Sequence, residues 1–481
     1  MTSRQLPDYQ VLSEPLLAFD PIDPAARSVH PLDGLLKHGP YSGVVVGVVP
    51  DRIRIAAIVP QGEGEAIMKV VSELRTPQEV TERRAYLPKY PGFAQVFGGD
   101  VVLAERVARI QLPEGLDAAI QSAEHPHRVL ADHLANALRS LDNNRTEFDV
   151  VYVYLPDRWR RAFKARDEDE EFDLHAFFKG LAASLGIASQ FLNEGTVYTK
   201  EHRASVMWTL ALALYAKAGG VPWKLATESP ETAFVGLSYA MRKGGASPGR
   251  YVTCCSQVFD AEGAGMEFIA YETDMSEAQL NGRNPYLTRQ QMQAVMARTL
   301  ALYQARHNGR VPRRLVIHKT TPFRRDEVDG CFDALGRVDD LELIQIQENV
   351  AWRAVQLKPP KGGRGQGEPD GYPCHRGSMI QLGSFELLLW TQGNSPPAGR
   401  GRDYYKEGTG IPRPLLLRRW AGRGPAEHVA SEVLGLTKMN WNNDAFYDTL
   451  PTTLRFASTL ADVVKTMPSL GHRPYSYRHF I

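Results

Sequence analysis

The sequence predicts an α/β protein with at least two domains. Short runs rich in β-branched residues alternate with longer segments of helical periodicity, the pattern of layered helices and sheets. The chain has 481 residues, whereas a single hydrophobic core stops growing at roughly 250–300 residues. No repeat with a period of about 20–50 residues is visible, which excludes a solenoid.

The first half has the order of elements expected of a nucleotide-binding, Rossmann-like unit. The expected elements are strands at 43–49 and 52–60, a helical stretch at 115–141, a strand at 149–155, a helix at 172–185, a strand at 189–192 and a helix at 199–219. The last helix stops at Gly219-Gly220 followed by Pro222, a common C-terminal signal, so Lys217 is expected in its last turn.

The second half begins with three strands and a helix, which resemble the opening of a ribonuclease-H-like fold. Strands are expected at 234–240, 251–259, 265–271, 314–318, 341–347, 379–382, 385–391 and 414–418, and helices at 287–307, 424–434 and 452–466. The domain boundary is expected within 222–230, which gives domains at 1–222 and 223–481. The Gly-rich tract at 361–371 is expected to be a flexible loop, either solvated or touching a phosphate backbone.

Charge and composition limit the possible functions. The 56 Lys and Arg nearly cancel the 55 Asp and Glu, so any nucleic-acid surface must be a local groove. The four cysteines include no CxxC pair, which indicates neither a disulfide framework nor a zinc site. Because the N-terminus lacks a signal-peptide pattern and no apolar run approaches about 18 residues, we expect a cytoplasmic protein without membrane contact.

Four polar residues of the first half have a spacing that could bring them to one anion. His175 and Lys179 are four residues apart on one expected helix, Gln190 follows on a short strand, and Lys217 closes the next helix. Each also has an ordinary interpretation, as a packed histidine, a solvated lysine or a lysine that complements a helix C-terminus.

The sequence around these residues resembles the MID domain of an Argonaute. The segments ASQFLNEGTV at 188–197 and ALYAKAGGVPW at 213–223 carry the resemblance. In that family a Tyr or His, a Lys four residues later, a Gln, and a Lys just before Gly-Gly-x-Pro-Trp bind the 5′-phosphate of a guide strand. The resemblance assigns these roles to His175, Lys179, Gln190 and Lys217.

The second half resembles the PIWI domain of the same family. FVGLSY at 234–239 is similar to its first strand, and VPRRLVIHKTT at 311–321 is similar to the strand that ends in a catalytic aspartate. At the positions of the catalytic acids this sequence has Ser238, Thr320 and, by a looser match, Ser458. Cleavage of this type needs carboxylates that hold two Mg²⁺ ions about 3.5–4 Å apart, which hydroxyl groups cannot replace. The resemblance therefore implies a binding protein and no enzyme.

Two alternatives remain open. An active guide-directed nuclease would need other carboxylates, and Asp260, Glu262, Glu267 and Asp274 are the candidates, although hairpin or solvated positions account for them. An unrelated dinucleotide-binding enzyme is disfavoured because no strand is followed by GxGxxG.

The resemblance covers nearly the whole chain, without room for separate N and PAZ domains, and is closest to short prokaryotic Argonautes. It implies a 5′-phosphorylated guide RNA, a complementary single-stranded DNA target, and a separate effector protein with an APAZ region and a sirtuin-like or TIR domain. That effector would consume NAD in defence against plasmids or phage. This chain would be the guide-binding subunit of a heterodimer.

The chain terminus, YSYRHFI at 475–481, is aromatic and apolar, so we expect it to be docked. In relatives of the family the terminal carboxylate returns to the MID pocket and, with the Gln that matches Gln190, holds a divalent cation against the guide phosphate. The resemblance therefore implies a Mg²⁺ site formed by Gln190 and Ile481. Mg²⁺ prefers hard oxygen ligands and commonly bridges carboxylate and phosphate oxygens. The alternative is that Phe480 and Ile481 only cover an interdomain seam.

Overall fold

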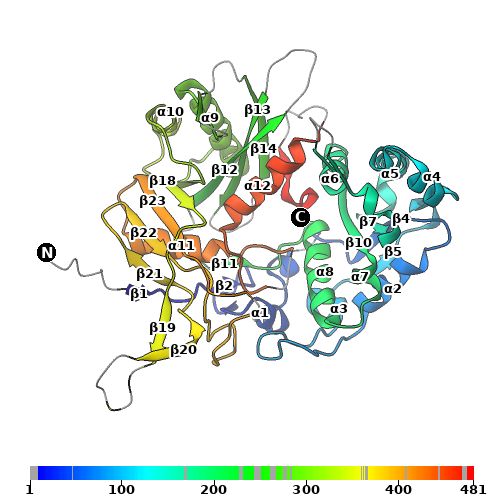
Figure 1. Ribbon diagram of the computed structural model, residues 1–481, viewed down its shortest axis with the longest axis horizontal. Helices are drawn as coiled ribbons and strands as arrows, with labels where there is room; N and C mark the ends of the chain where they lie inside the picture. The colour runs from blue at the N-terminus through cyan, green and yellow to red at the C-terminus, as the bar shows by residue number, and fades with distance from the viewer. Residues whose placement is uncertain are drawn as a thin grey trace.

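A five-stranded parallel sheet forms the centre of the first half (Figure 1). Its strands lie in the order β10 (Ala188–Asn193), β7 (Val150–Leu155), β4 (Arg52–Val59) and β5 (Asp100–Leu103), and β6 (Arg109–Gln111) also pairs with β4. All of these pairings are parallel. Every residue of β7 is buried, as expected for a strand covered by helices on both faces.

Alternate residues of this sheet pack into two different cores. Ile55 and Ala57 of β4 face a core that includes α2 (Glu65–Arg75) and α8 (Arg203–Lys217). Ala56 and Ile58 face a second core with α5 (Pro126–Asp142) and α6 (Leu174–Ser184). Successive side chains of a strand point to opposite faces, and both faces of this sheet are covered by a core. The strands are therefore apolar at consecutive positions of the sequence.

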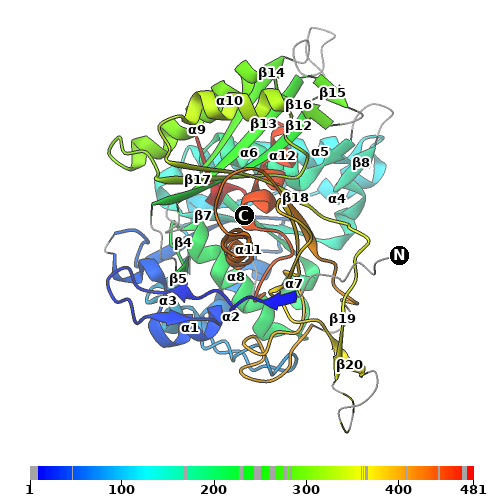
Figure 2. The ribbon, with the colours of Figure 1, turned by 90° about the vertical axis from the view of Figure 1, so that its left-hand side faces the viewer.

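A ten-stranded mixed sheet forms the second half (Figures 1 and 2). Its middle consists of three antiparallel strands followed by two parallel ones, the arrangement expected of a ribonuclease-H-like fold. These five strands are β14 (Glu267–Asp274), β13 (Tyr251–Asp260), β12 (Thr232–Arg242), β17 (Arg314–Lys319) and β18 (Asp340–Gln347). The predicted α/β fold class, with a Rossmann-like unit before a ribonuclease-H-like one, is confirmed.

Helices cover both faces of the large sheet. The core on one face contains side chains of α9 (Arg289–Arg306) and α10 (Arg325–Leu335). The core on the other face contains α11 (Ala426–Leu436) and α12 (Thr452–Val464), and it merges with the α8 side of the first sheet. One continuous apolar core therefore joins the two halves.

Segments close to both chain ends join the large sheet. The order continues from β18 through β23 (Leu415–Ala421), β22 (Glu386–Leu389) and β21 (Ser378–Gln381) to β1 (Tyr9–Val11), while β24 (Tyr475–Ser476) pairs with β14 at the opposite end. A small sheet of β2 (Leu17–Ala18), β3 (Arg27–Ser28) and β11 (Lys224–Leu225) links the N-terminal segment to the connection between the halves.

Three local expectations are wrong. The described residues of 43–49, which are 43–45 and 47–49, form no strand: a 3-10 helix spans Tyr41–Val44, and the Tyr41 amide donates to Pro222 O instead of joining a sheet. The helical stretch at 115–141 is two helices, α4 (Leu116–Ser122) and α5, because Pro126 starts a new helix at its first position. The Gly-rich tract is not a loop throughout, since β20 (Glu368–Pro373) occupies its last part.

This computed structural model describes residues 9–45, 47–166, 171–226, 231–242, 251–260, 267–274, 279–281, 284–358, 360, 362, 367–406, 409–442, 445–467 and 474–481. The start of the strand expected at 265–271 lies outside them. Within these ranges, no helix combines the length and the apolar character needed to cross a membrane.

Candidate functional site

Helix α6 brings His175 and Lys179 to one face. The helix starts at Leu174 because the Asp173 side chain accepts a hydrogen bond from the Ala176 amide at 3.0 Å, which caps its first turn. Residues four apart on a helix lie above one another, so Lys179 points the same way as His175. Lys179 is 3% exposed.

Helix α8 brings Lys217 to the same place from another direction. The helix ends when Gly219 adopts a φ of 104°, and the Gly220 amide donates to Tyr215 O at 2.9 Å. A Cβ at Gly219 would lie 3.2 Å from Val48 O, so the backbone at Val48 passes close to the end of α8. Lys217, in the last turn, is 1% exposed.

Four of the predicted residues converge into what we call the lysine pocket: Lys179, Gln190, Lys217 and Ile481. The Lys179 ammonium donates to Ser189 O at 2.6 Å and to Ile481 O at 2.7 Å. The Lys217 ammonium donates to Gln190 Oε1 at 2.7 Å. Residues 302 positions apart in the chain therefore meet in one site.

The predicted His175 lies beside the pocket with its ring packed on protein. The ring contacts Phe191 edge-on, with 5.5 Å between the centroids. Burial, with the nearby charges of Lys179 and Lys217, lowers the pKa of His175 to about 4. The imidazole is therefore neutral at pH 7 and can donate only one hydrogen bond at a time.

Among the described residues, neither buried lysine has an Asp or Glu partner, and the one carboxylate that reaches them is that of Ile481, whose O accepts from Lys179. Burial lowers the pKa of Lys179 to about 7. Burial and the charge of Lys179 together hold the pKa of Lys217 well below its usual value. A buried ammonium is costly unless an anion neutralises it, so the lysine pocket is built to receive negative charge.

Sequence reasoning missed three further residues near this pocket: two arginines, Arg145 and Arg478, and a histidine, His479. Arg145 donates to Phe148 O at 3.0 Å and to Gly186 O at 3.2 Å, and burial, with the charge of Arg478, lowers its pKa. His479 has both ring nitrogens buried, without a hydrogen-bond partner in the described part of the chain. Burial, with the charges of Arg478, Lys179 and Arg145, lowers the pKa of His479 to about 3.

The chain terminus is docked as predicted. Phe480 is 4% exposed and packs edge-on against Phe268, with centroids 5.3 Å apart, and Ile481 is 5% exposed. The Tyr477 hydroxyl donates to Gly220 O at 3.3 Å, next to the end of α8. The predicted docking of this aromatic tail was the sequence signal that could have identified Arg478 and His479. No sequence signal pointed to Arg145.

Gln190 Oε1 and Ile481 O fit Mg²⁺ by their chemistry, because both are hard oxygen donors. Each already accepts a hydrogen bond from a lysine ammonium. Among the described residues, no group of three or more His, Cys, Asp or Glu side chains could hold a metal ion. A metal here would therefore depend on ligand oxygens to complete its coordination.

The second predicted site, the β12–β17 site, consists of Ser238 and Thr320. Leu237 of β12 lies in register with Lys319 of the parallel β17, so Ser238 and Thr320 occupy the next position on the two adjacent strands. Thr320 is exposed and Ser238 is partly buried. Ser458, on α12, is exposed and forms no hydrogen bond with either among the residues that the structure describes.

A closed ion pair lies directly beside this site. Lys319 and Glu327, both 0% exposed, meet at 2.5 Å. The Lys319 ammonium lies 5.3 Å, 4.9 Å and 5.3 Å from the ring centroids of Tyr239, Tyr286 and Phe323. The alternative nuclease carboxylates are not placed: Glu262 and the side chains of Asp260, Glu267 and Asp274 lie outside the described residues.

No protein-family model matches the chain, and no curated protein matches its sequence. Among solved structures, it is similar to the Clostridium butyricum Argonaute bound to a guide DNA and a 19-mer target DNA, with a TM-score of 0.66 and 16% identity over 98% of this chain. It is also similar to Aquifex aeolicus Argonaute, with a TM-score of 0.56 and 14% identity over 99% of this chain.

The chain spans 55% of the length of the first protein and 57% of the second. At this identity the comparison carries the fold, and it extends over nearly the whole chain. The protein therefore has an Argonaute fold, with a mixed α/β architecture similar to that of the MID and PIWI domains.

Proposed function

We propose that this chain binds the 5′-phosphate of a guide strand in the lysine pocket and uses that strand to capture a complementary nucleic acid. The observation that carries the proposal is the pair of buried lysines, Lys179 and Lys217, neither of which has an Asp or Glu partner among the described residues. A terminal phosphate supplies the missing negative charge and several hydrogen-bond acceptors at one point. The similar Argonaute that is bound to a guide and a target supports the same function.

Each pocket residue has a defined part in this proposal. Lys179 and Lys217 donate charge-assisted hydrogen bonds to phosphate oxygens. Neutral His175 and His479 offer ring nitrogens as further donors or acceptors, and the Gln190 amide holds Lys217 in place when the pocket is empty. The protein thus binds the strand end and backbone, while base pairing reads the target sequence.

The proposal includes Mg²⁺ as a further source of positive charge beside the two lysines. Once a phosphate attracts the two ammonium groups, Gln190 Oε1 and Ile481 O lose their hydrogen-bond donors and become available as hard oxygen ligands. Bound there, Mg²⁺ would screen the repulsion between the phosphate and the Ile481 carboxylate.

We further propose that the chain does not cut nucleic acid. Ser238 and Thr320 lie at adjacent positions of paired strands and offer hydroxyl groups instead of carboxylates. The carboxylate of Glu327, beside this site, is engaged by Lys319 and by the Arg324 amide at 2.9 Å. With Mg²⁺ or Mn²⁺, no guide-directed cleavage of a matched target is expected. Cleavage at a fixed distance from the guide end would establish the nuclease alternative.

The partner part of the proposal rests on the resemblance of the sequence to short prokaryotic Argonautes. The chain spans little more than half the length of the Argonautes to which its structure is similar. We propose a short prokaryotic Argonaute subunit with a guide RNA, a single-stranded DNA target and an APAZ-containing, NAD-consuming effector. The isolated chain should then hydrolyse no NAD, and rapid NAD loss by this chain alone would overturn that division of labour.

The direct test compares guides that differ only at the 5′ end. Fluorescence anisotropy with a 5′-phosphorylated RNA and the same RNA with a 5′-hydroxyl should give a much lower Kd for the phosphorylated strand. Hydrogen bonds to charged groups are worth about 1.5–3 kcal/mol each, so the difference should reach about ten- to a hundred-fold. Equal affinities would refute the assignment of the pocket.

A further inference from the structure

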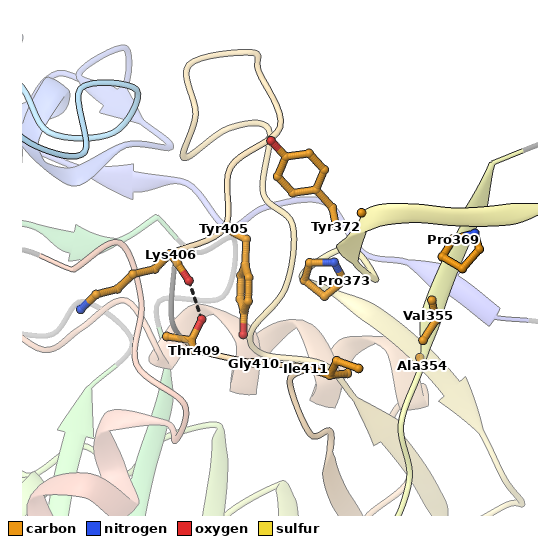
Figure 3. Close-up of a pocket in the computed structure, with 11 residues that line it drawn as sticks. Ala354, Val355, Pro369, Tyr372, Pro373, Tyr405, Lys406, Thr409, Gly410 and Ile411 are labelled. Carbon is orange, nitrogen blue, oxygen red and sulfur yellow. Dashed lines mark hydrogen bonds between the residues drawn. The ribbon is translucent and has the colours of Figure 1, made fainter.

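Charged side chains are distributed unevenly over the second half of the chain. An open cavity of about 560 Å³ lies between β19 (Val355–Lys358) and the segment of Tyr405, and Lys406 has the one charged side chain among its described lining residues (Figure 3). In contrast, six titratable side chains gather where α11 packs against the large sheet. We call them the α11 cluster: Arg314, Asp340, Glu342, Arg419, His428 and Glu432.

Ion pairs between different elements connect the members of this cluster. Arg314 of β17 pairs with Asp340 of β18 at 3.0 Å and with Glu432 of α11. Arg419 of β23 pairs with Glu342 of β18 at 3.0 Å. Arg314 also lies 3.9 Å from Glu342, which joins the two sets of pairs. The cluster therefore links α11 to three strands of the sheet.

The centre of the cluster is buried, whereas its edge reaches solvent. The Glu342 side chain is 0% exposed, and those of Arg314, Glu432 and Arg419 are 10%, 12% and 14% exposed. His428 Nε2 lies 3.2 Å from Glu432 Oε1, and the His428 side chain is 43% exposed, so its proton can exchange with water. Charges at the depth of Glu342 are costly unless opposite charges balance them.

The charges of the cluster balance only when it holds one additional proton. Its three carboxylates carry three negative charges when ionised, while its two guanidinium groups carry two positive ones, because arginine stays protonated. A protonated His428 supplies the third positive charge. The neighbouring Arg423 and Glu427 are exposed and of opposite sign, so they leave this balance unchanged.

Two members of the cluster are able to hold that proton near neutral pH. The hydrogen bond with Glu432 raises the pKa of His428 above its ordinary value of 6.5. Burial raises the pKa of Glu342. Both shifts favour the proton-bound form of the cluster, in which the buried charges are balanced.

The other end of α11 contacts the junction between the two halves of the chain. The Trp223 indole N–H donates to Lys438 O at 3.0 Å, and the Lys438 ammonium donates to Pro15 O of the N-terminal segment at 2.7 Å. A Cβ on Gly435 would lie 2.8 Å from Leu225 Cδ1, so α11 packs closely on β11. The cluster thus anchors one end of a helix whose other end holds this junction.

We propose that the α11 cluster is a proton-dependent latch, which holds the start of α11 on the large sheet while His428 is protonated and releases it when that proton is lost. Without the proton, one negative charge is unbalanced, and Glu432 keeps Arg314 as its remaining ion-pair partner among the described residues. The proposal is independent of the proposed guide-binding function, because no member of the cluster belongs to the lysine pocket.

The sign of the pH dependence follows from the raised pKa of His428. A group whose pKa is higher in the folded state binds its proton more tightly there, so the proton stabilises the fold. This contribution is fully present below the unfolded pKa of 6.5 and is lost as pH rises through the higher folded value. The latch should therefore be closed at pH 6 and open at pH 9.

The titration of His428 tests the proton directly. NMR signals of the full chain with ¹³C-labelled histidine are recorded against pH, and the His428 signal is assigned as the one missing from His428→Gln. Its midpoint should lie above 6.5 and should fall in Glu432→Gln, which removes the hydrogen-bond acceptor. A wild-type midpoint at or below 6.5 would overturn the proposal.

Stability and hydrogen exchange test the latch itself. The urea midpoint of wild type should exceed that of His428→Gln at pH 6, and the difference should shrink by about half or more at pH 9. After correction for the intrinsic rate, amide exchange at the start of α11 should be several-fold faster in wild type at pH 9 than at pH 6. His133→Gln, on α5, is the matched control and should show neither effect. A pH-independent difference between wild type and His428→Gln would show a packing role only and reject the latch.

A double variant separates lost charge from lost packing. His428→Gln leaves three carboxylates with two arginines, and Asp340→Asn restores the balance by removing one of the carboxylates. At pH 6 the double variant should therefore recover about half or more of the urea midpoint lost in His428→Gln, although Asp340→Asn alone should lower the midpoint of wild type. If the two losses simply add, charge balance does not hold α11 in place, and the proposal fails.

Discussion

The lysine pocket and the β12–β17 site both contain a buried lysine, but their surroundings differ. Lys319 is neutralised within the protein by Glu327 and surrounded by aromatic rings. Lys179 and Lys217 have no Asp or Glu partner among the described residues: Lys179 donates to Ser189 O and to Ile481 O at the chain terminus, and Lys217 donates to Gln190 Oε1. A lysine that is neutralised by a Glu side chain contributes to the fold, whereas two buried lysines without such a partner can bind an anionic ligand. The partner of a buried charge, more than the burial itself, therefore marks the binding site.

The largest expected effect is on the free energy of unfolding, when the Lys319–Glu327 ion pair is broken. Glu327→Gln leaves Lys319 buried without a counterion, and breaking a buried pair in this way costs about 3–5 kcal/mol of unfolding free energy. Urea denaturation measures the loss. Asp329→Asn, on the exposed side of the same helix, is the control and should change stability little. A loss of less than about 1 kcal/mol in Glu327→Gln would contradict the role assigned to the pair.

The converse substitution in the lysine pocket should affect binding and spare stability. Lys217→Met removes a buried charge that has no acidic partner, so the ligand-free protein should be as stable as the wild type or more so. The 5′-phosphate preference should fall about ten- to a hundred-fold in anisotropy titrations. Lys164→Ala, with a side chain 81% exposed, provides the control. Strong destabilisation without loss of the preference would indicate a structural lysine.

The pH dependence of binding provides a third comparison. Lys179 has a pKa of about 7 in the empty pocket, and a bound phosphate raises it, so binding above pH 7 requires proton uptake. The ratio of affinities for 5′-phosphate and 5′-hydroxyl guides should therefore fall as pH rises above about 7, by up to about tenfold per pH unit. In Lys179→Met the ratio should be smaller and should depend less on pH in this range, with Lys217 as the remaining lysine of lowered pKa.

Stability without guide should change with pH in the opposite direction. The unfolded chain holds the Lys179 proton up to its ordinary pKa of 10.5, whereas the folded chain releases it near 7. Folding is therefore favoured as pH rises between these values, because the unfolded state binds more protons there. Wild type should therefore gain stability relative to Lys179→Met between pH 7 and 9, and the absence of such a gain would contradict the lowered pKa of Lys179.

The smallest expected effect concerns the divalent ion. EDTA should weaken binding of the 5′-phosphorylated guide roughly tenfold or less, since the lysines supply the main charge. A residue added after Ile481 converts its carboxylate to an amide and should abolish the response to EDTA, while an N-terminal tag should not. If tagged and untagged proteins respond equally to EDTA, Ile481 is not a metal ligand.

The fold class and most of the lysine pocket could be read from the sequence. The apolar run VVYVYL is a local signal that predicted the buried strand β7. The helix stop at Gly219-Gly220 is another, and it correctly placed Lys217 in the last turn of α8. The four-residue spacing placed His175 and Lys179 on one helix face. The error at residues 43–49 came from the same kind of signal, because a β-branched run forms a strand only if a sheet edge is available to it.

Only the tertiary structure decided which charges are neutralised. Nothing in the local sequence distinguishes Lys319 from Lys179, because the carboxylate of Glu327 and the oxygen of Ile481 reach them through the packing of other elements. The same is true of Arg145, which approaches Arg478 only after the terminus docks. Sequence periodicity fixes the face of a helix, but burial and counterions depend on long-range packing. The partner of a buried charge is therefore a property of the fold.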